Sequence, residues 1–118
     1  MSAVLPTNRP PANVYEANGQ VSVAVPVPGA HPEQTTIELS SDRLMLDAVC
    51  KYPQESQHLL RREWKVGRWH LELDLPLRVD PTRAQATLNL GVLVVMAPSA
   101  TGAHGALRVP ISRVHGPS

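Results

Sequence analysis

The sequence predicts an all-β protein, built as a β-sandwich or a barrel. Two stretches alternate as half-buried strands do: residues 20–25 have valine at every second position, and residues 69–75 have Trp or Leu there. Twelve prolines and seven glycines interrupt the chain often, which favours short strands over long helices. The sequence shows no stretch with the apolar period of a helix.

The strands are expected to be short and separated by turns or loops. Residues 1–12 contain three prolines and no periodicity, and we interpret them as a flexible arm. Turns are expected at Asn18-Gly19 and at residues 29–33 and 40–43, and a loop at residues 51–58. Small residues at positions 99–106 indicate a flexible linker. The expected strands cover residues 13–16, 20–25, 35–39, 44–49, 59–64, 69–75, 83–88 and 92–96.

Composition bounds the size and the class of the protein. Its 118 residues suffice for one domain with a single core. Eleven Lys and Arg residues nearly balance ten Asp and Glu residues, which argues against a nucleic-acid-binding protein with a basic face. No apolar run is long enough to span a membrane, and the first residues lack the pattern of a secretory signal. A single cysteine, Cys50, is typical of a reducing cytoplasm, where we expect the protein.

The sequence contains no constellation typical of catalysis, a metal site or a cofactor site. Its five histidines are scattered, and no pair has the spacing of zinc ligands. Cys50 and His58 have no third residue that would orient them as a nucleophile and its base. A glycine-rich phosphate loop is also missing, which argues against the use of ATP. We therefore expect no enzymatic activity and no cofactor.

The stretch that ends at Pro98 carries the most specific motif of the chain. An Ala followed at fixed spacing by Gly-Val-Leu, Val and Pro resembles the signature of the α-crystallin domain of small heat shock proteins. Further segments resemble the same family in the same order along the chain. The signature residues are Ala86, Gly91, Val92, Leu93, Val95 and Pro98, and the other segments are Asn13-Val14-Tyr15-Glu16, Val27-Pro28-Gly29, Leu60-Arg61-Arg62-Glu63, Leu75-Pro76, Val79-Asp80-Pro81 and Val109-Pro110-Ile111.

One residue of the signature hairpin departs from the family pattern. Leu90 stands where the family usually has Asn before Gly-Val-Leu. Leucine is a poor residue for a positive φ. We therefore expect Asn89 or Gly91 to carry the strained conformation of this turn.

The resemblance implies a fold, a domain organisation and a function. The fold would be an immunoglobulin-like β-sandwich, the α-crystallin domain, over residues 13–98. A flexible arm of residues 1–12 would precede it, and a C-terminal extension of residues 99–118 would follow. The function would be that of an ATP-independent chaperone, or holdase, which binds partly unfolded client proteins under stress and suppresses their aggregation. The chain would form a homodimer and modest higher oligomers.

The resemblance also implies three sets of site residues. Two alternating β-branched residues of the tail would enter an apolar groove, and the linker would let the tail reach a neighbouring dimer. The tail docking motif is Val109, Pro110 and Ile111, and the docking and client groove is Ile37, Leu39, Ala86 and Leu88. A dimer strand that crosses to the partner's sheet edge would consist of Leu59, Leu60, Arg61, Arg62, Glu63 and Trp64.

Other functions remain compatible with the sequence. A β-sandwich co-chaperone or adaptor would bind one folded partner with a defined stoichiometry. A subunit with a short arm would modulate a longer small heat shock protein. A small enzyme is the third alternative, and the sequence offers no constellation for it.

Overall fold

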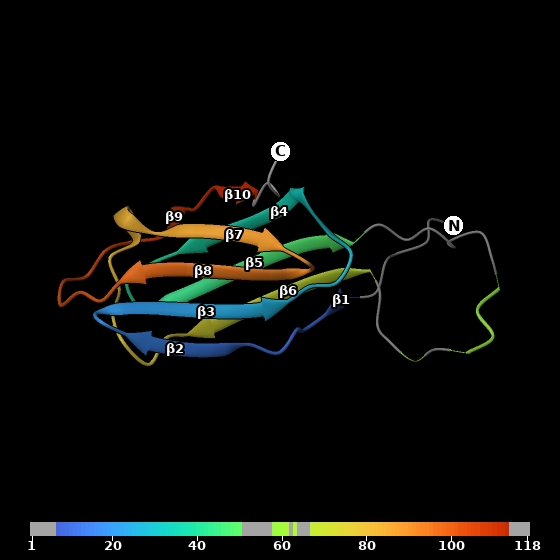
Figure 1. Cartoon of the computed structure of the whole chain (residues 1–118), viewed down its shortest axis with the longest axis horizontal. Coiled ribbons are helices and arrows are strands. Elements are labelled where there is room, and N and C mark those ends of the chain that lie inside the picture. Colours follow the sequence, from blue (N-terminus) through green and yellow to red (C-terminus); the bar gives the residue numbers. More distant parts are fainter. Residues whose placement is uncertain (1–6, 51–57, 62, 64–66, 114–118) are drawn as a thin grey trace.

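The computed structural model describes residues 7–50, 58–61, 63 and 67–113. Two five-stranded sheets pack face to face as a sandwich (Figure 1). Sheet A has the order β1 (Thr7–Asn8), β6 (Arg68–Asp74), β5 (Arg43–Cys50), β4 (Ala30–Leu39) and β9 (Leu107–Arg108). Sheet B has the order β10 (Ile111–Arg113), β7 (Gln85–Asn89), β8 (Val92–Pro98), β3 (Gln20–Pro26) and β2 (Asn13–Ala17). The predicted all-β sandwich is confirmed.

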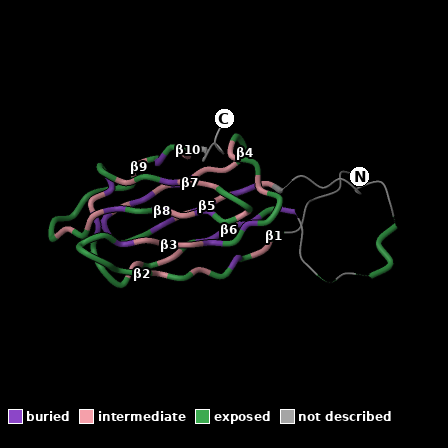
Figure 2. The backbone as a smooth tube through the Cα atoms, viewed as in Figure 1, coloured by how far each residue is buried: buried purple, intermediate pink, exposed green. Residues whose placement is uncertain are grey.

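Alternation along the strands builds the core. In β3 every second residue is buried, and β8, its neighbour in sheet B, repeats the pattern, so their apolar side chains face sheet A together. Figure 2 shows buried and less buried segments alternating along the central strands. The core is almost entirely aliphatic, as the absence of Phe requires. Its members are Val21, Val23, Val25, Val27, Ile37, Leu39, Leu44, Leu46, Ala48, Trp69, Leu71, Val79, Ala86, Leu93, Val95, Ala97 and Val109.

Both tight hairpins use two-residue turns with positive φ at both central positions. The β2–β3 turn has φ values of 54° at Asn18 and 75° at Gly19. The β7–β8 turn has 54° at Leu90 and 79° at Gly91. Gly91 thus carries a positive φ as expected, but Leu90 carries one as well, and the expectation that the turn would shift away from Leu90 was wrong. The ladder pairs Asn89 with Val92, so the turn must fall on residues 90 and 91, and this turn type needs positive φ at both.

Two further elements differ from the expected boundaries. β4 begins at Ala30, within the expected turn, and its pairing with β5 is irregular between Ala30 and Thr35. A register break of this kind lets one strand continue through residues that look like a turn in sequence. A 3₁₀ turn, η1 (Pro81–Arg83), precedes β7, because the Asp80 carboxylate accepts a hydrogen bond from the Thr82 N–H at 2.9 Å and caps it.

The expected strand over residues 59–64 is absent from the described residues of that segment. Leu59, Leu60, Arg61 and Glu63 lie in no strand, and residues 58–61 stand away from the two sheets at the right of Figure 1. Arg62 and Trp64 lie outside the described residues. A strand needs a neighbouring edge for its hydrogen bonds, and no strand of the described residues pairs with this segment. Its role in a dimer stays a prediction.

The described part of the N-terminal arm is attached to the sandwich. Thr7 and Asn8 pair in parallel with Arg68 and Trp69 at the edge of sheet A. Pro10 is fully buried, and the chain then crosses to sheet B, where it forms β2. Residues 7–12 therefore close one side of the sandwich, whereas proline content alone had suggested a free arm.

A candidate docking groove between the two sheets

The side of the sandwich opposite β1 and β2 carries the candidate site. On this side, β4 is the last long strand of sheet A, and β7 is the last long strand of sheet B. Alternation turns Ile37 and Leu39 of β4 inward, where they are 0% and 2% exposed. Ala86 of β7 is buried as well, and Leu88 packs against the core. The four residues predicted for the groove thus lie in or against the core on the two strands that border this side, and their role as a docking and client groove stays a prediction.

The C-terminal tail runs along this side of the sandwich, where it pairs first with β4 and then with β7 (Figure 1). In β9, Leu107 pairs with Leu39 antiparallel, on the edge of sheet A. The Val109 N–H donates to the Ile37 carbonyl at 3.0 Å. In β10, Ile111 pairs with Ala86 in parallel, on the edge of sheet B. The tail therefore fills the groove of its own chain, whereas the sequence led us to expect it on a neighbouring dimer.

The chemistry of the motif explains how the tail changes sheets. Val109 is 4% exposed and belongs to the core, and Ile111 is partly buried against it. Pro110 between them is exposed, and it has no N–H to donate to either ladder. The chain can leave sheet A and join sheet B at this residue without losing a backbone hydrogen bond. The two β-branched side chains meanwhile fill the gap between the sheets.

The linker before the tail is attached at two points. The Ala100 N–H donates to the Arg78 carbonyl at 2.9 Å. Further on, the N–H and the hydroxyl of Ser41 both donate to the His104 carbonyl at 3.1 Å, and the His104 N–H donates to Ser41 Oγ at 2.7 Å. Among the described residues, Ser41 is the one buried polar residue, at 4% exposure. The sequence indicated a turn at Ser41 and gave no sign of this contact, which joins residues 63 positions apart.

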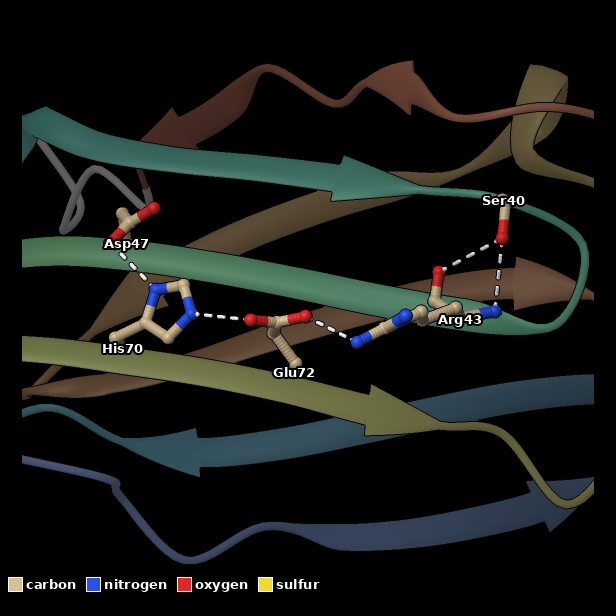
Figure 3. Close-up of polar contacts among 5 residues, drawn as sticks. All are labelled: Ser40, Arg43, Asp47, His70 and Glu72. Atoms are coloured by element: carbon tan, nitrogen blue, oxygen red, sulfur yellow. Dashed lines mark hydrogen bonds and ion pairs between the residues drawn. The ribbon is translucent and has the colours of Figure 1, made fainter.

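The outer face of sheet A carries a chain of polar contacts, shown in Figure 3. His70 of β6 uses Nδ1 to contact Asp47 Oδ1 at 2.9 Å and Nε2 to contact Glu72 Oε2 at 3.0 Å. Glu72 also pairs with Arg43. The hydrogen bonds to Glu72 and then to Asp47 raise the pKa of His70, and those from His70, with the charge of Arg43, lower the pKa of Glu72. This network ties β5 to β6 and lies outside the groove.

The predicted dimer segment and its expected partner edge lie on other parts of the surface. Leu59 is 48% exposed and Leu60 is 89% exposed. β2 is the last strand of sheet B, and no strand of the described chain pairs with its outer side. An edge of this kind presents unpaired N–H and C=O groups to another chain. The geometry leaves both halves of the expected exchange available on one protomer.

The described residues contain no group of three or more His, Cys, Asp or Glu side chains placed to hold a metal ion. They also contain no helix long and apolar enough to cross a membrane.

Two comparisons place this architecture among known proteins. Solved structures of small heat shock proteins share the fold of two facing sheets. Heat shock protein 16.0 from Schizosaccharomyces pombe superposes with a TM-score of 0.69 at 22% identity, over 81% of this chain and 70% of that one. The hspA of Xanthomonas axonopodis gives 0.67 at 22%, over 77% and 93%. A small heat-shock protein from Xylella fastidiosa gives 0.66 at 24%, over 79% and 87%.

A comparison of the sequence with family models identifies the family. The model of the Hsp20/alpha crystallin family matches residues 13–112, and this chain belongs to that family. A comparison with curated proteins gives no match. The family match includes the tail residues Val109 and Ile111 and every strand from β2 to β9.

Proposed function

We propose that this protein is an ATP-independent holdase that captures partly unfolded proteins in the groove between β4 and β7. The supporting observation is the tail itself. Val109 and Ile111 pack against the core at alternate positions of an extended segment, and the Ile37 carbonyl of β4 accepts a hydrogen bond from the Val109 N–H, which supports binding of other extended apolar segments at this place. Unfolded polypeptides expose many such segments, and hydrogen bonds to their backbone do not depend on the sequence of the segment. Family membership and the absence of any catalytic constellation in the sequence also favour this function over an enzyme.

The groove is suited to weak, exchangeable binding. Complete burial of one side chain such as valine contributes about 1.5–3 kcal/mol. Ordering of the bound segment and loss of rigid-body freedom offset much of this gain. A single groove therefore holds a client briefly, and several grooves in one assembly hold it longer through their high effective concentration. No nucleotide is needed for release, because binding is already reversible.

We further propose a homodimer in which residues 59–64 of each chain add a strand to the β2 edge of the other. This exchange would satisfy the unpaired backbone groups of both segments and close a two-fold symmetric pair. Modest larger assemblies would form when tails dock on neighbouring dimers. The Xylella fastidiosa protein has a distinct high order structure, which supports self-association in this family. We place the protein in the cytoplasm, in accordance with its single cysteine.

Light scattering from heated model clients tests the holdase. Several unrelated clients are heated with and without this protein, in the absence of nucleotide. We expect aggregation of all of them to be suppressed at stoichiometric ratios. No effect on any client, even in excess, would reject the holdase. Binding of one folded partner at a fixed stoichiometry, without broad suppression, would identify an adaptor instead.

A further inference from the structure

The contact between Ser41 and His104 lies just before the tail, where it controls how far the tail can reach. Ser41 sits in the β4–β5 turn, its side chain is buried, and all its polar contacts with the linker go to the backbone of His104. The Ser41 carbonyl in turn accepts a hydrogen bond from the Val79 N–H at 2.9 Å, which fixes the turn to the body of the sandwich. We refer to Ser41 and His104 as the clamp.

The clamp shortens the free length of the tail by almost half. From the attached residue Ala100 to Val109 there are nine residue steps, and a fully extended chain of that length spans about 31 Å. From His104 to Val109 there are five steps, which span about 17 Å. Closed, the clamp leaves the tail long enough for its own groove. Open, it gives the tail the longer reach that docking on a second molecule needs.

Ser41 is buried, and its hydroxyl therefore needs the hydrogen bonds that it forms with the backbone of His104. Burial of a hydroxyl without a partner is unfavourable, and the linker provides that partner while the tail is docked in its own groove. When the linker leaves, the Ser41 hydroxyl loses both of its hydrogen bonds with His104. The serine therefore favours the docked arrangement through the hydrogen bonds that it makes with His104.

We propose that Ser41 is the positioning residue that keeps the tail in the groove of its own chain and disfavours its transfer to a second copy. The groove is then self-occupied at rest, and opening of the clamp exposes it. The freed groove fits an extended segment with apolar residues at alternate positions, supplied by the tail of a second copy. Client binding in the same groove rests on the proposed function, but the clamp does not, and it is tested without any client.

A cross-link distinguishes the two docking modes. Glu38 and Arg108 face each other across the β4–β9 ladder and lie outside the core. In a Cys50→Ser background, Glu38→Cys and Arg108→Cys are combined in one chain and oxidised. We expect a disulfide within single chains, seen as one single-chain band on a denaturing, non-reducing gel at every protein concentration. Covalent products of two or more chains as the main outcome would overturn the proposal.

Mixing the two single-cysteine proteins then measures transfer of the tail. Chains with Glu38→Cys alone and chains with Arg108→Cys alone should give almost no Glu38–Arg108 linked pair. Adding Ser41→Ala to both should raise the yield of that pair about tenfold, because two hydrogen bonds with His104 are lost. Ser40→Ala is the matched control: Ser40 bonds to Asp42 and Arg43 within its own turn and makes no contact with the tail. The same yield for both variants would overturn the role of Ser41.

Amide exchange keeps the proposal testable if the cross-link perturbs the tail. The Val109 N–H is protected by its bond to Ile37. In Ser41→Ala its exchange should accelerate about tenfold to a hundredfold, and in Ser40→Ala it should stay within about twofold. His104→Pro removes the N–H that donates a hydrogen bond to Ser41 Oγ and leaves Ser41 itself unchanged. This variant should reproduce the faster exchange of the Val109 N–H. Unchanged exchange in folded Ser41→Ala and His104→Pro proteins would refute the clamp.

Discussion

Val109→Ala tests whether the tail is part of the core of its own chain. Val109 is 4% exposed, so nearly all of its side chain is removed from water. The substitution deletes two carbons, each worth about 0.8 kcal/mol of transfer free energy, and so costs about 1.6 kcal/mol. The space left in the core raises the expected loss of unfolding free energy to about 2–3 kcal/mol.

The free energy of docking sets an upper limit to this loss. A tail that tolerates the cavity poorly can leave the groove, and the protein then loses the docking free energy and no more. Removal of residues 107–118 measures that quantity directly. Equal losses for the truncation and for Val109→Ala would mean that the point substitution is enough to release the tail. A smaller loss for Val109→Ala would mean that the shortened side chain stays docked.

Urea unfolding followed by circular dichroism is the assay, at one fixed protein concentration because self-association changes apparent stability. Ser112→Ala is the control, since Ser112 is exposed on the same tail and its loss should change the free energy by less than about 0.5 kcal/mol. If Val109→Ala is as stable as the control, the tail contributes nothing to the core. Docking of the tail on its own chain would then be refuted.

Four further predictions concern other parts of the molecule. Leu90→Asn should stabilise the fold by about 0.5–1 kcal/mol in urea unfolding, because Leu90 is 94% exposed at a positive φ that asparagine tolerates better; a loss of stability would contradict this. His70→Gln should destabilise the protein near pH 6 and have little effect near pH 9. The pKa of His70 is raised in the folded state, so the stabilisation by charged His70 disappears as the pH rises through this folded-state pKa. An equal effect at both pH values would exclude a charged His70. Replacement of residues 57–64 by a Gly/Ser loop should give monomers in sedimentation velocity, and an intact dimer would exclude the strand exchange. Val109→Ala combined with Ile111→Ala should hold the protein at the dimer under conditions in which the wild type exceeds it by light scattering; equal masses would assign the larger assemblies to residues 1–12.

Two of these tests have internal controls. Leu77→Asn changes a 40% exposed leucine that has no positive φ, so it should give none of the gain expected at Leu90. Asp47→Asn removes one of the two carboxylates that contact His70, so it should weaken the pH-dependent stabilisation without abolishing it. If Leu77→Asn stabilised the fold equally, removal of an exposed leucine would explain the result and turn strain would not.

The fold was predictable because each strand carries its own pattern. The valines of β3 and the Trp and Leu residues of β6 report a buried face through alternation, and that pattern depends on residues two positions apart. The burial of Ile37 and Ala86 was predictable for a related reason, because both are apolar members of alternating strands. The spacing of Val109 and Ile111 marked the tail as a strand.

What the sequence left out depends on contacts between distant or unpatterned residues. Residues 99–106 are small and without periodicity, so nothing in them indicated the attachment of His104 to Ser41, far away in the chain. The positive φ of Leu90 runs against the preference of leucine itself, and the ladder around the turn imposes it. Thr7 and Asn8 form too short a strand for any pattern, and the exposed edge of β6 holds them in place.

The two segments that close the sides of the sandwich, one with β1 and β2 and the other with β9 and β10, are synthesised at different times. β1 and β2 close their side of the sandwich with residues that are made before all the other strands of both sheets. β9 and β10 close the other side with residues that leave the ribosome after every strand that lines the groove. A nascent chain must therefore assemble both sheets while the apolar strip around Ile37 and Ala86 is still open to water and to its neighbours. A protein that we propose protects others from aggregation thus passes through a stage in which it needs the same protection itself.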